Sequence, residues 1–370
     1  EIMSSKDIRQ KFLKFFESRD HKVVPSSSLI PDDPSVLLTT AGMQQFKPYF
    51  VGNADPMKDF GSKNTVSIQK CFRTSDIDKV GDESHLTFFE MLGNFSFGGY
   101  FKKEAVEYGY EFIKDWMGLE IDKVTVFDQA EVPAGDWRKK VPFDKESYEL
   151  WKRILPEKKI ERAGVDNFWG PTGSEGPCGP TTEIYVNTAL RRAHGKPPLE
   201  IWNIVFNEFY RDANNNLKPL ETPGVDTGMG LERLAMVAQG APTIFDTDLF
   251  KELMDCVEIG VPWHEKNIEN KRIIADHIRG IAFLIADGVR PSNKEAGYIL
   301  RRLVRRVVAY GADSRRLLRL VVENYENFYP ELNRETIRSV FADESEKFEK
   351  TLRRGIKELE SLEKIDAKTA

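Results

Sequence analysis

The first 18 residues carry apolar positions with a helical period. Ile8, Phe12, Phe15 and Phe16 fall on one face of a helix drawn over residues 4–18. Ser4 stands three residues before Asp7, which is the spacing of a capping box with Asp in place of Glu. The pattern therefore predicts a helix here. The same periodicity predicts helices at 102–117, 246–259, 271–287, 294–310, 315–328 and 334–364.

Other segments follow the pattern of strands. Residues 65–75 and 85–99 are predicted strands joined by a charged loop, which makes a long-looped hairpin, and 199–211 is a third. Residues 167–186 are rich in Gly and Pro, so we expect irregular backbone that ends in the strand-like "EIYV". Mixed elements up to about residue 242 and helices afterwards predict an α+β fold of two domains, 1–242 and 243–370.

The amino-acid composition argues against several classes of protein. Hydrophobic residues make up 40% and charged residues 31%, as in ordinary globular proteins, and the net charge is -5. A nucleic-acid surface would therefore have to be local. Three well-separated cysteines, without a C-x-x-C pair, favour a reducing, cytoplasmic location and argue against disulfides and structural zinc. The absence of a long apolar run predicts no membrane span.

The stretch "VDTGMGLERLA" at 225–235 looks suited to phosphate, yet it matches neither the phosphate-loop nor the dinucleotide pattern. Asp226 could hold an ammonium group or could serve as a helix cap or turn residue. Gly228 and Gly230 allow a ligand close to the backbone. Arg233 falls in the first turn of the next helix, where a cation is unfavourable unless an anion lies in front of it.

Four further residues could bind a ligand or could have a purely structural role. Arg73 and His85 flank the charged loop and would suit a polyphosphate, although Arg73 could instead pair with Asp76 or Asp78. Trp169 and Trp202 stand among turn formers or apolar residues, where tryptophan is usually core.

A basic face is predicted on the helix at 294–310, where Arg301 and Arg305, and Arg302 and Arg306, are i,i+4 neighbours. Residues 294–319 contain eight Lys or Arg against two Asp or Glu. This face could contact the nucleic-acid backbone, or it could be solvated or paired within the chain.

Together these segments resemble the N-terminal part of the alanyl-tRNA synthetases, a family of class II aminoacyl-tRNA synthetases. The similarity runs in family order over about 300 residues and is carried by the segments 37–52, 69–81, 85–105, 167–185, 200–206, 226–234 and 274–306. "FFEMLGNFSFG" and "DTGMGLER" are the most diagnostic.

The resemblance implies an antiparallel class II sheet, a catalytic domain over 1–242 and a helical tRNA-recognition domain over 243–370. It implies that alanine and ATP give alanyl-adenylate, from which alanine passes to the 3′ end of tRNA-Ala. Arg73 would bridge the alanine carboxylate and the α-phosphate, Arg233 would cover adenine and the γ-phosphate, and His85 would approach the outer phosphates. Leu86 stands where many relatives have a second histidine.

The remaining implied ATP-binding residues are Phe89, Met91, Trp169, Ile201, Trp202, Asn203 and Gly230. For alanine, Asp226 would hold the ammonium group and Asn203 would orient the molecule, while Trp169, Val205 and Gly228 would shape a small pocket that discriminates poorly against glycine and serine. Mg²⁺ is expected with ATP, and Glu208 is the candidate ligand.

For tRNA, the resemblance implies recognition of a G·U pair in the acceptor stem, with Asn293 at the minor groove and the arginines 301, 302, 305 and 306 at the backbone. The editing domain, with its zinc, and the C-terminal dimerising domain of the family have no counterpart here. We therefore expect no zinc and a monomer, as either an excised fragment or a short synthetase. Two other functions stay open: an amino-acid ligase with a different acceptor, and a non-catalytic tRNA-binding protein.

Overall fold

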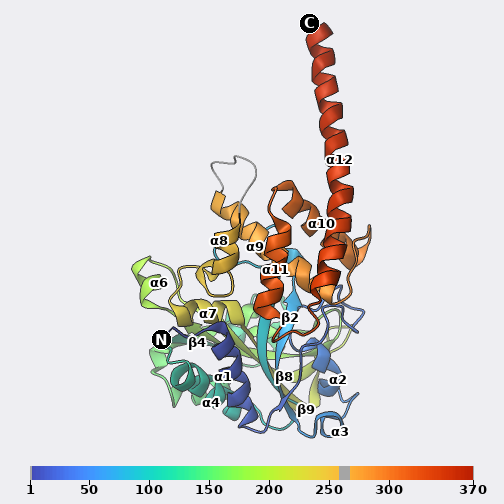
Figure 1. Cartoon of the computed structure of the whole chain (residues 1–370). Coiled ribbons are helices and arrows are strands. Elements are labelled where there is room, and N and C mark those ends of the chain that lie inside the picture. The colour runs from blue at the N-terminus through green and yellow to red at the C-terminus, as the bar shows by residue number, and fades with distance from the viewer. Residues whose placement is uncertain (1, 258–266, 370) are drawn as a thin grey trace. The chain divides into compact units, whose positions relative to one another are not determined.

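The computed structural model describes residues 2–257 and 267–369, and the side chains of 267 and 363–369 are not described. The described chain forms two compact units (Figure 1). The first comprises residues 1–71 and 89–249, and the second comprises 72–88 and 250–370.

The first unit begins with helix α1 (Ser5–Glu17), and the capping box of Ser4 and Asp7 is present as predicted. Its further helices are α2 (Lys47–Phe50), α3 (Pro56–Phe60), α4 (Lys102–Glu111), α5 (Lys145–Lys152), α6 (Ala189–Ala193) and α7 (Leu231–Gln239). The predicted helix at 102–117 is α4 followed by a π-helical turn at Phe112–Trp116.

The strands are β1 (Lys22–Val23), β2 (Asn64–Phe72), β3 (Phe88–Ser96), β4 (Ile121–Phe127), β5 (Ile160–Ala163), β6 (Phe168–Trp169), β7 (Gly176–Val186), β8 (Leu199–Arg211) and β9 (Leu217–Gly230). Within the described residues they form one sheet in the order β1-β2-β3-β9-β8-β7-β4-β5, with β6 paired to β7. The run from β3 to β4 is antiparallel, as expected, whereas β1 with β2 and β4 with β5 are parallel.

The expectation of irregular backbone through most of 167–186 was wrong, because β7 begins at Gly176. Its glycines are tolerated for a packing reason: a Cβ on Gly179 would lie 1.7 Å from the Phe206 carbonyl oxygen of β8. Here Gly allows two backbones to approach within the sheet.

One face of the sheet is covered by α1 and α4. Phe12 of α1, Phe112 after α4 and Trp202 of β8 make edge-to-face contacts with centroids 5.3–6.0 Å apart. The apolar stripe predicted from the first 18 residues therefore packs against this side of the sheet and buries it.

The second unit contains α8 (Lys251–Cys256), α9 (Asn267–Ala286), α10 (Glu295–Ala309), α11 (Ser314–Tyr325) and α12 (Arg334–Thr369). The last four confirm the predicted helices with small shifts at the ends. The helix predicted at 246–259 is shorter at its start, and residues 258–259 lie outside the described residues. Within the described chain, none of the helices has both the length and the apolar composition that spanning a membrane requires.

Candidate active site

The strand register gathers the residues predicted for the amino acid on one face of the sheet. Asp226 of β9 lies opposite Phe95 of β3 and Val205 of β8, and Gly228 lies opposite Asn203. Directly opposed residues in antiparallel strands share a face. Val205, Asn203, Asp226 and Gly228 therefore lie together on the side away from α1 and α4, which we call the open face.

The same face carries several of the residues predicted for ATP. Gly230 lies opposite Met91 of β3. Phe89 follows by the two-residue alternation of β3, whereas Ile201 lies at a register shift of β8, where the alternation does not assign its face. Trp169 of β6 packs against an aromatic cluster that includes Phe95, the residue opposite Asp226.

Asp226 is a buried carboxylate without a partner. The residue is 5% exposed, and its carboxylate forms no hydrogen bond or ion pair with the described residues. Burial raises the pKa of its carboxyl to about 7. It does not cap α7, whose N-cap is Gly230, so the capping alternative was wrong. An isolated buried carboxylate is costly, and a cationic ligand would remove that cost.

Polar atoms near Asp226 are also left without partners. Asn207 is fully buried, and neither its amide oxygen nor its amide nitrogen is hydrogen-bonded. Asn203 Oδ1 and Thr181 Oγ1 are likewise buried, and neither has a hydrogen-bond partner among the described residues. Thr181 lies opposite Val205, the residue that faces Asp226, and Asn203 lies opposite Gly228. Buried polar groups are normally hydrogen-bonded, so this cluster is arranged for a small polar ligand or ordered water.

The absence of a side chain at Gly228 leaves space between this strand and Met91. A Cβ at this position would lie 2.8 Å from the Met91 sulfur, closer than van der Waals contact permits. The same sulfur lies 3.4 Å from the backbone nitrogen of Gly42. The Met91 side chain thus lies close to two glycine backbones, beside the space in which a ligand of Asp226 would lie.

Arg233 lies in the first turn of α7. Its Nη1 donates to the Glu200 carbonyl oxygen at 3.2 Å and approaches the Glu200 carboxylate at 3.3 Å, while 40% of the side chain remains exposed. The guanidinium is held by one weak ion pair and keeps donors free for an anion.

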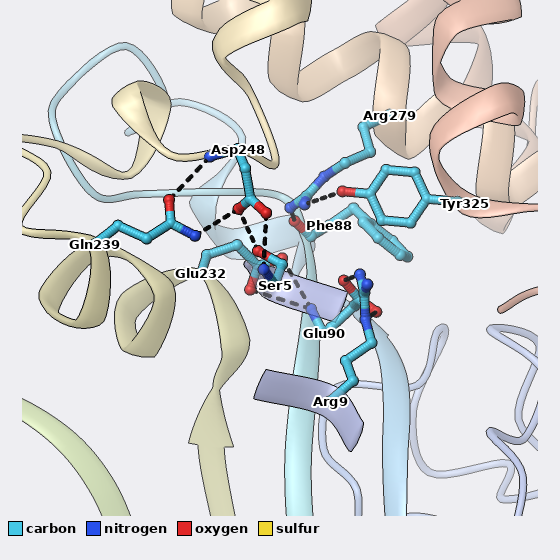
Figure 2. A network of polar contacts seen from close by, with 9 residues as sticks. All are labelled: Ser5, Arg9, Phe88, Glu90, Glu232, Gln239, Asp248, Arg279 and Tyr325. Atoms are coloured by element: carbon cyan, nitrogen blue, oxygen red, sulfur yellow. Dashed lines mark hydrogen bonds and ion pairs between the residues drawn. The ribbon is translucent and has the colours of Figure 1, made fainter. Parts of the chain in front are cut away.

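A network of polar contacts in the first unit, buried around Arg9, Glu90 and Glu232, fixes the first turn of α7 (Figure 2). Arg9 of α1 pairs with the Glu90 carboxylate at 2.6 Å, and the Glu90 backbone nitrogen donates to the carboxylate of Glu232, the residue before Arg233. Gln239, at the other end of α7, donates to Asp248, which accepts from Ser5 at 2.7 Å. Both ends of α7 are therefore anchored to α1 or β3.

Two predicted residues lie on the opposite face of the sheet. Trp202 is 1% exposed in the core among Phe12, Phe16 and Phe112, so it is removed from the ATP-binding set. Glu208 pairs at 2.8 Å with the buried Lys102 of α4. Because that ammonium already neutralises the carboxylate, Glu208 is removed as the Mg²⁺ ligand.

Arg73 and His85 belong to the second unit. Arg73 directly follows β2, is exposed, and its backbone nitrogen donates to the Thr87 carbonyl oxygen at 2.8 Å. His85 forms an ion pair with Asp82 within the same loop. Thr87 in turn donates twice to the buried carboxylate of Asp276 in α9, which fixes the end of the loop.

The predicted basic face of α10 is largely paired within the chain. Arg301 donates to the buried Glu344 of α12 at 2.9 Å and also contacts Asn293. Arg302 pairs with Asp78 at 2.7 Å, and Arg305 lies 3.5 Å from Glu344. Arg306 contacts the Ile77 carbonyl oxygen at 3.3 Å. Arg302 and Arg305 keep 42% and 47% of their side chains exposed, whereas Arg301 keeps 19%.

Sequence reasoning missed Asn207, Thr181 and Glu183. The alternation of "IWNIVFN" would have placed Asn207 on the same face as Asn203 and Val205. Glu183 lies opposite Asn203, and its pKa is raised by burial and by the nearby Glu200 carboxylate. Glu183 begins the segment "EIYV", which was predicted as strand-like, but a strand position alone does not indicate which residues of β8 lie opposite it.

The sequence matches a known family. Residues 7–369 match the family of class II (A) tRNA synthetases, and the chain belongs to that family. Among its curated relatives, the alanine–tRNA ligase of Rubrobacter xylanophilus is 43% identical over 98% of this chain and 44% of its own length. That of Thermotoga maritima is 42% identical over 100% of this chain and 44% of its own length. The chain therefore spans less than half the length of these relatives.

Among solved structures, a pyrrolysyl-tRNA synthetase from Desulfitobacterium hafniense is similar with a TM-score of 0.38 and 12% identity, covering 66% of this chain and 72% of that one. A putative aspartyl-tRNA synthetase from Leishmania major has a TM-score of 0.38 and 13% identity, covering 66% and 63%.

Proposed function

We propose that this chain activates L-alanine with ATP and transfers it to the 3′ end of tRNA-Ala. The observation that carries the proposal is the unpaired, buried Asp226 beside Gly228, on strand β9 that leads into Arg233. An ammonium group bound there would neutralise the carboxylate, and Gly228 leaves space for a very small side chain. The names of the relatives support alanine as that amino acid.

In the first step, a carboxylate oxygen of alanine attacks the α-phosphorus of ATP. A new P–O bond forms, the bond to the β-phosphate oxygen breaks, and pyrophosphate leaves with its electron pair. The nucleophile is already ionised, so no proton needs to be removed. The barrier comes from bringing two anions together, and positioning and charge neutralisation lower it.

The residue roles follow from that requirement. Arg73 bridges the alanine carboxylate and the α-phosphate, and Arg233 binds adenine and the γ-phosphate with the donors that Glu200 leaves free. His85 approaches the outer phosphates. Asn203, Val205 and Trp169 surround the alanine, and the remaining ATP contacts come from Phe89, Met91, Ile201 and Gly230.

The residues present fit a Mg²⁺ ion bound with ATP. Mg²⁺ is commonly held by one or two carboxylates plus substrate phosphates. Burial raises the pKa of the Glu183 carboxyl, and the neighbouring Glu200 carboxylate adds to that rise, so a cation would favour the charged form of Glu183. When bound, the ion neutralises phosphate charge. Glu183 replaces Glu208 as the proposed ligand, because Glu200 is paired with Arg233.

In the second step, a hydroxyl oxygen of the terminal adenosine attacks the carbonyl carbon of the adenylate and forms an ester. The bond from that carbon to the phosphate oxygen breaks, AMP leaves with the electron pair, and the hydroxyl proton passes to the phosphate or to solvent. The helical unit is proposed to bind the acceptor stem, with Asn293 facing the minor groove at the G·U pair. Arg302 and Arg305 are the better candidates for phosphate contacts, because Arg301 and Arg306 are held by partners within the unit. The protein is proposed to act as a cytoplasmic monomer.

The test is alanine-dependent ATP–pyrophosphate exchange, followed by charging of tRNA-Ala transcripts with and without the G·U pair. We expect exchange with alanine and charging that depends on the pair, and Arg73→Ala serves as the inactive control. No exchange would refute the proposal. Exchange without charging would favour a ligase with another acceptor.

A further inference from the structure

A second basic surface lies between α11 and α12 in the helical unit. A groove with a volume of about 410 Å³ opens there. Its apolar floor consists of Leu318, Val322 and Ile337. The charged residues that line it are Asp313, Arg315, Arg316, Arg319, Arg334 and Arg338.

The arginines of this groove are less neutralised than those of α10. Arg315 and Arg316 are exposed, and neither forms an ion pair with a described residue. Arg319 and Arg334 share a single carboxylate, Glu323, at 3.7 and 3.2 Å.

The remaining charged residues of the groove do not balance the positive charge of these arginines. Arg338 pairs with Glu335 at 2.8 Å on the exposed surface. Asp313 caps α11 by accepting from the Arg316 backbone nitrogen at 3.3 Å. Five arginines thus face three carboxylates, and two of these three lie outside the groove lining.

The chemistry of the lining favours phosphate diesters. Every cation in it is arginine, whose planar fork of donors matches phosphate oxygens bidentately and is more weakly hydrated than an ammonium group. Several such groups around one groove would contact successive phosphates without reading sequence. We propose that the α11–α12 groove binds the phosphate backbone of RNA, a contact separate from that of α10.

This inference rests on the proposed function only for the identity of the RNA, which would be the tRNA substrate. It changes which helices are expected to contact the RNA backbone. The helix predicted from sequence, α10, uses most of its arginines within the unit, whereas α11 and α12 present theirs to solvent around a hollow. Sequence-independent affinity is therefore assigned mainly to α11 and α12.

The experiment measures how binding of a tRNA-Ala transcript depends on salt, by fluorescence anisotropy. The test variant is Arg315→Ala/Arg316→Ala. The control is Arg353→Ala/Arg354→Ala, which removes the same charge from exposed positions of α12 outside the groove. Each lost phosphate contact should make the slope of log Kobs against log salt shallower by about 0.9, so the test variant should lose nearly 2 and the control close to zero.

Three further measurements keep the result specific. Alanine-dependent exchange should be unchanged in both double variants, and circular dichroism should show that both are folded. The charge-conserving variant Arg315→Lys/Arg316→Lys should recover most of the slope. A transcript without the G·U pair should show the same loss of slope, because the contact does not read sequence.

An equal slope in the test and control variants would overturn the proposal, and so would wild-type protein that does not bind the transcript. Displacement of tRNA by polyglutamate as effectively as by an unrelated RNA duplex at equal charge would identify an acidic-peptide site instead. Loss of exchange in the wild type would refute the synthetase proposal, while a difference in slope between the variants would still support the RNA groove.

Discussion

The open face of the sheet and the basic face of α10 differ in whether their charged side chains have partners. On the sheet, the buried Asp226 carboxylate has no cation among the described residues, and the side-chain amide of the neighbouring Asn207 has no hydrogen-bond partner among them. On α10, Arg301, Arg302 and Arg306 are satisfied by Glu344, Asp78 and a backbone carbonyl, respectively. A buried polar group without a partner indicates a missing ligand, whereas an exposed charge with a nearby counter-charge does not.

The largest effect is expected from Asp226→Asn, which keeps the shape and removes the charge. Loss of one partner of a buried charged pair costs on the order of 4 kcal/mol, or roughly a thousandfold in the KM for alanine. Exchange assays over a range of alanine concentrations measure it. A change below tenfold would contradict the role of Asp226 as the ammonium partner.

Lys102→Met should cause the largest loss of stability. Lys102 is the shared partner of the buried Asp144 and of Glu208, and its removal leaves carboxylates without a counter-charge, at a cost of about 3 kcal/mol. Urea unfolding at pH 7 measures it. Lys123→Met is the control, because its pair with Glu161 is largely exposed and should be worth less than about 1 kcal/mol. Equal losses would show that Lys102 is not a structural cation.

Asp226 should also make the stability of the unliganded protein depend on pH. Its folded-state pKa of about 7 lies above the ordinary value of 3.8, so the folded state binds the proton more tightly. That stabilisation is present below about pH 4 and is lost as the pH rises through 7, which amounts to roughly 2–3 kcal/mol between pH 5 and pH 8. Asp226→Asn should lack this loss in urea unfolding at the two pH values. An identical pH dependence in the variant would rule out Asp226 as its source.

Gly228→Ala should have a smaller and selective effect. The added methyl group meets the Met91 sulfur, and because that side chain is flexible, the space beside Asp226 should shrink without loss of the fold. We expect the KM for alanine to rise about tenfold in exchange assays, which corresponds to roughly 1.4 kcal/mol. Exchange with glycine, which lacks the methyl group, is the internal control, and an equal loss with both amino acids would argue against a steric origin.

Arg302→Ala should have the smallest effect. Its ion pair with Asp78 is exposed, so removal should cost less than about 1 kcal/mol of stability. The KM for tRNA should rise a few-fold with exchange unchanged. Asp78→Asn breaks the same pair but keeps the arginine, so an equal effect of both variants on charging would mean that Arg302 acts through Asp78 and not on RNA.

The sequence predicted local features better than long-range ones. The stripe Phe12–Phe16 and the capping box are set by short spacings, and α1 matches them. The faces of residues 202–207 of β8 were also accessible from alternation, which separates Asn203 from Trp202. By contrast, the pairs Lys102–Glu208 and Arg301–Glu344 join positions far apart in the chain, and no local pattern indicates them.

Strand β8 also limits where the length of this chain can change. Its alternate residues serve two unrelated tasks, with Asn203, Val205 and Asn207 on the open face and Trp202, Ile204 and Phe206 in the core. An insertion or deletion of one residue within it would exchange the two sets. The turn at 212–216, where Asp212 accepts from the backbone nitrogens of Asn214 and Asn216, lies beyond both sets. We therefore expect members of this family to differ in length at that turn and to keep the number of residues between Trp202 and Asn207 constant.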